Sequence, residues 1–71
     1  MYEYVILVAT QKTEFKQYYK TRKEALTAFN SFLYGVPFIA TVDTLIELYR
    51  CKVGEFDYHL TPIKSKFISI P

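Results

Sequence analysis

The chain has 71 residues, a formal net charge of +2, and 51% hydrophobic and 18% aromatic residues. This length fits one domain, residues 1–71, and the single cysteine, Cys51, excludes an intrachain disulfide. A chain this short buries only about 60% of the surface that its unfolded form exposes, so we expect dense aromatic packing and self-association to stabilise it.

The composition also bears on where the protein acts. The longest apolar run, residues 5–9, is too short to cross a bilayer. The N-terminal residues lack the basic-then-apolar pattern of a signal peptide, and a lone cysteine fits a reducing compartment. We therefore expect a cytoplasmic protein without membrane contact.

Two strands are predicted at the start of the chain. Residues 2–10 form an almost continuous run of apolar, β-branched and aromatic residues, typical of a strand covered on both faces. The polar residues 10–13 predict a hairpin connection to a second strand over residues 14–20. On this second strand, alternation places Phe15, Gln17 and Tyr19 on one face. It places on the other face Lys16, Tyr18 and Lys20.

The strongest local signal is a helix beginning at Thr21. The Thr21 hydroxyl can accept a hydrogen bond from a first-turn N–H, and Glu24 completes a capping box. An apolar stripe with helical spacing follows: Ala25, Leu26, Phe29, Phe32 and Leu33. Gly35 and Pro37 are then expected to end the helix.

Two cations, Arg22 and Lys23, occupy the first helical turn, where the helix dipole favours acids. One interpretation is that tertiary packing outweighs a cost of a few tenths of a kcal/mol. The other is that these cations meet an anion at the helix N-terminus. The first interpretation is the simpler one, and both remain open.

Residues 41–53 match the strand and helix templates about equally. We favour a strand from residue 44, because Gly54 and the alternating residues 55–60 would complete a second hairpin. Pro62 would end that last strand, leaving residues 62–71 as a short extra strand or a tail.

This element order, ββαββ, predicts an α+β fold in which one helix packs on one face of a small antiparallel sheet of about four strands. The sequence does not indicate which face the helix covers. The uncovered face is a candidate protein interface, and the residues we assign to it are aromatic: Tyr2, Tyr4, Tyr49, Phe56 and Tyr58.

Signals for catalysis are weak. Cys51 and His59 could form a nucleophile–base pair, but no third orienting group is apparent, and a buried cysteine with a surface histidine is the commoner situation. The two glycines, Gly35 and Gly54, are too far apart for a phosphate-binding loop. We predict no catalytic residues, no cofactor and no metal site.

Residues 12–23 interleave cations with aromatic rings, which predicts contact with an anion or with nucleic acid. Cations can meet phosphates, and tyrosine rings can stack on unpaired bases. The candidate residues are Lys16, Tyr18, Lys20, Arg22 and Lys23. A solvated edge strand protected by lysines would show the same pattern.

In its length and its Lys-, Tyr- and Ile-rich composition, the chain resembles accessory proteins encoded by phages and other mobile elements. Many of these bind and block a host protein or a nucleic-acid enzyme, so the resemblance implies an inhibitor in the host cytoplasm. It rests on composition and carries over no residue. We predict a small non-enzymatic binding protein that forms a dimer or larger assembly and binds a protein partner. The alternative is a nucleic-acid or nucleotide-binding module using residues 12–23.

Overall fold

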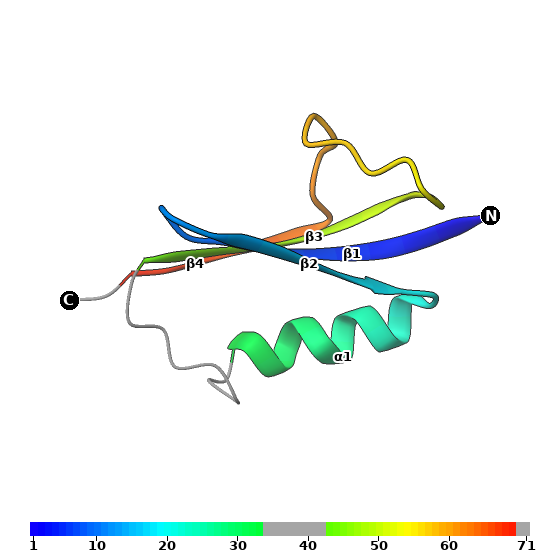
Figure 1. Ribbon diagram of the computed structural model, residues 1–71. Helices are drawn as coiled ribbons and strands as arrows, with labels where there is room; N and C mark the ends of the chain where they lie inside the picture. The colour runs from blue at the N-terminus through cyan, green and yellow to red at the C-terminus, as the bar shows by residue number, and fades with distance from the viewer. Residues whose placement is uncertain (34–42, 70–71) are drawn as a thin grey trace.

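The computed structural model describes residues 1–33 and 43–69. Along the chain, these residues form β1 (Tyr2–Ala9), β2 (Glu14–Tyr19), α1 (Arg22–Leu33), β3 (Thr44–Lys52) and β4 (Lys64–Ile68). The four strands make one antiparallel sheet in the order β2-β1-β3-β4, and α1 lies across one face of it (Figure 1). The predicted α+β fold, with a small antiparallel sheet and one helix, is confirmed.

β1 is an inner strand, and this explains its apolar run. It pairs with β2 on one edge and with β3 on the other. Its four central residues, Val5 to Val8, are all buried. Because neighbouring side chains on a strand point to opposite faces, burial of consecutive residues requires cover on both sides of the sheet.

The predicted start of α1 is confirmed. The Glu24 N–H donates to Thr21 Oγ1 at 3.2 Å, and the Thr21 hydroxyl donates to Glu24 Oε1 at 3.0 Å. Thr21 thus caps the helix, with the Glu24 carboxylate bound to the hydroxyl instead of to the Thr21 N–H. The predicted stop at Gly35 and Pro37 lies outside the described residues.

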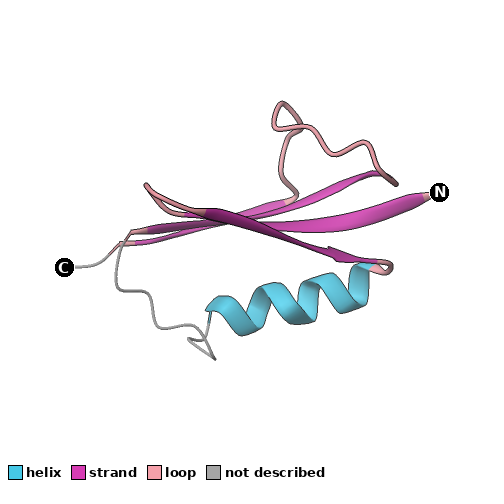
Figure 2. Cartoon of the chain, viewed as in Figure 1, coloured by secondary structure: helices cyan, strands magenta, loops and turns pink. Residues whose placement is uncertain are grey.

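Different segments pack on the two faces of the sheet. On the helix side, Ala25 and Phe29 of α1 pack on the sheet in a core whose strand residues are Ile6, Val8, Ile46 and Leu48. On the opposite side, which we call the loop side, residues 53–63 fold back over the sheet (Figure 2). Phe56 and Leu60 of this loop pack there on a second core of Val5, Leu7, Tyr49 and Cys51.

The prediction of a strand over residues 55–60 is wrong. These residues belong to the loop 53–63, in which Gly54 has a φ of +80° and the Leu60 N–H donates to the Asp57 carbonyl at 3.1 Å. Their alternating apolar side chains dock onto the sheet instead of extending it. The strand beside β3 is β4, within the predicted tail 62–71, and the ambiguous segment before the loop is the strand β3.

Candidate functional site

The loop 53–63 is held against β2 by Lys16. Its Nζ lies 5.1 Å from the Tyr58 ring centroid, 5.7 Å from that of Phe56, and 3.8 Å from Glu14 Oε1. The Tyr58 hydroxyl donates to the same Glu14 oxygen at 2.6 Å, and this adjacent hydroxyl raises the pKa of Lys16. The Lys16 ammonium is therefore compensated within the molecule by one carboxylate and two ring faces.

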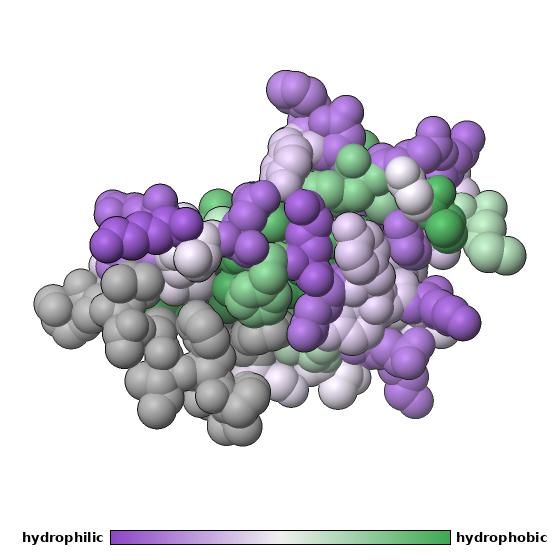
Figure 3. All heavy atoms as spheres, in the orientation of Figure 1, coloured by the Kyte–Doolittle hydropathy of each residue, from purple (hydrophilic) through white to green (hydrophobic). Residues whose placement is uncertain are grey.

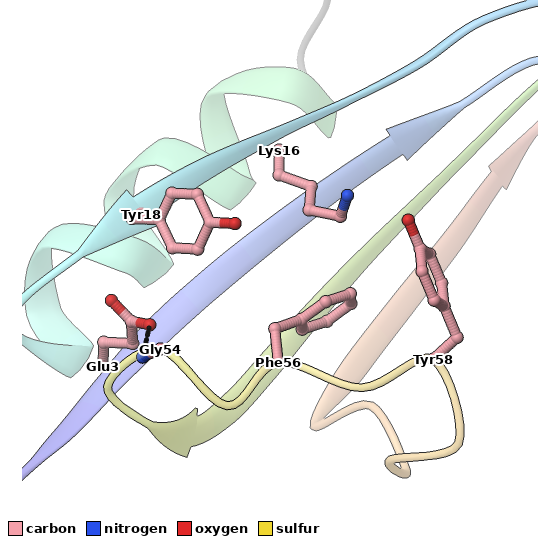
Figure 4. A pocket seen from close by; sticks show the side chains of 6 residues that line it. All are labelled: Glu3, Lys16, Tyr18, Gly54, Phe56 and Tyr58. Carbon is pink, nitrogen blue, oxygen red and sulfur yellow. Dashed lines mark hydrogen bonds between the residues drawn. The ribbon is translucent and has the colours of Figure 1, made fainter.

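A hollow of about 250 Å³ opens beside this contact (Figure 4). Lys16 and Tyr18 of β2 line one flank, Phe56 and Tyr58 of the loop line the other, and Glu3 accepts the Gly54 N–H at 3.0 Å at one end. The hollow is thus bounded by groups that already bind one another.

The candidate interface aromatics separate into two groups. Tyr49 is only 4% exposed; it meets the Phe56 ring edge-on at 5.1 Å and donates to Glu47 Oε1 at 2.8 Å. Burial, and then the bond to Glu47, raise the pKa of Tyr49 to about 12. Tyr4 packs against the helix-side core. Tyr49 is therefore buried, Tyr4 and Phe56 are half-buried against the two cores, and Tyr2 and Tyr58 are exposed.

Cys51 is 5% exposed and lies in the loop-side core. Burial, followed by the charges of Glu3 and Glu55, raises its pKa, which favours the unreactive thiol over the thiolate. His59 is an exposed loop residue whose backbone N–H donates to Asp57 Oδ1 at 2.8 Å. Within the described residues, no group of three or more potential metal ligands gathers.

The strand register sorts charges onto opposite sides of the sheet. Directly paired residues share a face, so the pairs Tyr4–Arg50 and Tyr2–Lys52 place both cations on the helix side. Lys64 and Lys66 join them, since they pair with the core residues Leu48 and Ile46. These four side chains are all exposed, and no strand residue on the helix side is acidic. We call Arg50, Lys52, Lys64 and Lys66 the basic strip.

The acidic residues of the strands lie on the loop side, and each accepts a hydrogen bond. Glu3, Glu14 and Glu47 accept hydrogen bonds from the Gly54 N–H, the Tyr58 hydroxyl and the Tyr49 hydroxyl, respectively. By contrast, no described residue forms an ion pair with a cation of the basic strip. One side of the sheet therefore has acids that accept hydrogen bonds. The other has cations with no carboxylate partner among the described residues, although the Arg50 guanidinium lies against the Tyr2 ring.

The structure divides the five candidate anion-contact residues. Lys16 and Tyr18 lie on the loop side, because they pair with Leu7 and Val5 of that core. Lys20, Arg22 and Lys23 are exposed at the start of α1, which lies at the same end of the sheet as the end of β3 (Figure 1). The helix start thus lies at the end of the sheet where β3 contributes Arg50 and Lys52 to the basic strip.

Sequence reasoning missed the four strip residues. Each pair, Arg50 with Lys52 and Lys64 with Lys66, has the two-residue spacing of one strand face. This spacing was the available signal. It was not sufficient, because residues 62–71 are predicted as either an extra strand or a tail, and the sequence does not show the strand pairing that joins the two pairs.

Comparison of the chain with models of protein families, with curated proteins and with solved structures found no match. In residues 1–33 and 43–69, no helix has both the length and the hydropathy needed to cross a membrane. The functional argument therefore depends on the geometry and charge of the described residues.

Proposed function

We propose that this chain is a small, non-enzymatic binding protein whose helix-side basic strip binds nucleic acid. The observation that supports this function is the charge partition of the sheet. The strands carry four cations and no acid on the helix side, against three acids and one cation on the loop side. Strand cations that share a face with no strand acid attract a polyanion.

The site differs from the one that sequence spacing suggests. The Lys16 ammonium contacts Glu14 and the rings of Phe56 and Tyr58. It cannot bind a phosphate without losing those contacts. The exposed cations of β3 and β4 take its place, and Lys20, Arg22 and Lys23 extend the positive surface at the helix start.

The direct test is the salt dependence of oligonucleotide binding, measured by fluorescence anisotropy with a labelled strand. Four phosphate contacts predict that log K falls against log salt with a slope of about −2.8 for a single strand. Between 50 and 200 mM salt, this slope corresponds to about a 50-fold loss of affinity. No binding at 50 mM salt to either a single strand or a duplex would contradict the proposal.

A second candidate function, binding of a protein partner or of a second copy, is favoured by a separate surface. Beyond the loop, Ala9, Leu45 and Phe67 form a directly paired row on the loop side and line a hollow of about 280 Å³. Phe67 is 57% exposed. Figure 3 shows further hydrophobic atoms at the surface along the level of the sheet. Exposed apolar side chains of this kind are typical of association sites.

If the Phe67 row joins two copies, Phe67→Ser is expected to convert a dimer to a monomer, because it removes the largest exposed apolar group of the row. Sedimentation equilibrium over a concentration series measures the mass. Phe15→Ser is the matched control, since Phe15 is 42% exposed and lies on the helix side. A monomeric wild-type chain at every concentration, or equal effects of the two substitutions, would exclude self-association through this row.

A further inference from the structure

Exposed aromatic rings are spread over the molecule, and one of them lies within the basic strip. Of the aromatics that are exposed within the described part of the chain, Tyr18, Tyr58 and Phe67 lie on the loop side, in the strands or in the loop itself. Phe15 and Tyr2 lie on the helix side. Among these described aromatics, only Tyr2 contacts a strip cation: the Arg50 guanidinium carbon lies 3.9 Å from its ring centroid.

The Arg50 contact limits the motion of the Tyr2 ring. A guanidinium lying over a ring face is attracted by the ring quadrupole, which restrains the side chain. Tyr2 nevertheless remains 46% exposed. A restrained but accessible ring loses little conformational entropy when a second flat group stacks on it, and each base stacked on an aromatic ring contributes about 1–3 kcal/mol.

The cations continue from this ring across the sheet. Lys52 lies directly opposite Tyr2, Arg50 is diagonal to it, and Lys64 is in turn diagonal to Arg50. This path runs over β3 and β4. The helix α1 lies on the same face of the sheet and packs on β1, β2 and β3 (Figure 1). A flexible single strand can follow such a path, whereas a duplex is stiff and keeps its bases paired inside.

From this arrangement we infer that the basic strip takes single-stranded nucleic acid in preference to duplex, with the Tyr2 ring stacked on an unpaired base and the strip cations on the adjoining phosphates. The inference rests on the proposed function and specifies its ligand. Stacking is indifferent to base identity, because every base has a π-face. We therefore expect a preference for unpaired strands with little dependence on sequence.

The experiment compares a labelled single strand of about 12 nucleotides, within the usual site sizes, with a duplex of the same length. The proteins are wild type, Tyr2→Ala, Tyr2→Phe and the control Phe15→Ala. We expect the wild type to bind the single strand more tightly than the duplex. Tyr2→Ala should weaken single-strand binding about tenfold, corresponding to one lost base stack. Tyr2→Phe and Phe15→Ala should bind like the wild type, and duplex binding should be the same in all four.

The outcomes distinguish base stacking on Tyr2 from nucleic-acid binding by the basic strip. Equal binding of single strand and duplex, or equal affinities of Tyr2→Ala and wild type for the single strand, would overturn the stacking inference and leave the basic strip as a general nucleic-acid site. Absence of binding to both oligonucleotides would overturn both. A circular-dichroism melt shows whether Tyr2→Ala is folded, and Tyr2→Leu, which keeps an apolar side chain without a ring, provides a second test of the same loss.

Discussion

Replacing all four strip cations by glutamine is expected to lower the affinity for a single strand about 100-fold at 50 mM salt. The variant is Arg50→Gln, Lys52→Gln, Lys64→Gln and Lys66→Gln. Four exposed charge contacts at about 0.7 kcal/mol each correspond to this factor. The salt dependence should fall to that of the cations at the helix start, because no phosphate counterions would be released by the strip. Anisotropy titrations at several salt concentrations measure both quantities.

The change in salt dependence should depend on where the cation lies and not on net charge alone. Lys66→Gln and Lys12→Gln each remove one cation, but Lys66 is in the strip and Lys12 is in the hairpin between β1 and β2. We expect Lys66→Gln to reduce the salt slope by about 0.7, the contribution of one phosphate on a single strand, and Lys12→Gln to leave it unchanged. Equal effects of the two substitutions would refute a localised site. All these side chains are exposed, so the fold should be retained.

Phe29→Ala is expected to destabilise the protein by about 3–5 kcal/mol, the usual cost of truncating a buried phenylalanine. Phe29 is 2% exposed and connects α1 to the sheet residues Ile6, Val8, Ile46 and Leu48. Because a domain this small is expected near the low end of the usual range of about 5–15 kcal/mol, we expect the substitution to remove most of its stability. Urea denaturation followed by circular dichroism measures the change.

Phe15→Ala is the matched control for this loss, since Phe15 is 42% exposed and outside the helix-side core. We expect it to change the free energy of unfolding by less than about 1 kcal/mol. If Phe29→Ala were no more destabilising than Phe15→Ala, the helix would not be held by the core described above.

Local signals in the sequence were sufficient for the helix and the first two strands. The cap at Thr21 depends on Glu24, three residues away, so both partners are visible in a short window. The apolar run of β1 indicates cover on both sides, as its inner position in the sheet requires.

The last third of the chain could not be predicted in the same way. Phe56 and Leu60 alternate with polar residues as in a strand, yet they dock as loop side chains on Val5, Leu7, Tyr49 and Cys51. Alternation shows that apolar groups are spaced for burial. It does not show whether the backbone of these residues pairs with a neighbouring strand. That depends on which segment of the chain forms the more stable pairing with the edge of β3.

Residue spacing alone indicates the residue types of the site, which are cations two residues apart with tyrosines near them. The tertiary structure alone decided which side chains share a surface. It separated Lys16 and Tyr18 from the helix start and joined Arg50, Lys52, Lys64 and Lys66. The physical reason is the two-residue period of a strand, because a shift of one residue in pairing moves every side chain to the opposite face. The register, set by the two cores together, places the strip cations on one side of the sheet and the hydrogen-bonded strand acids on the other.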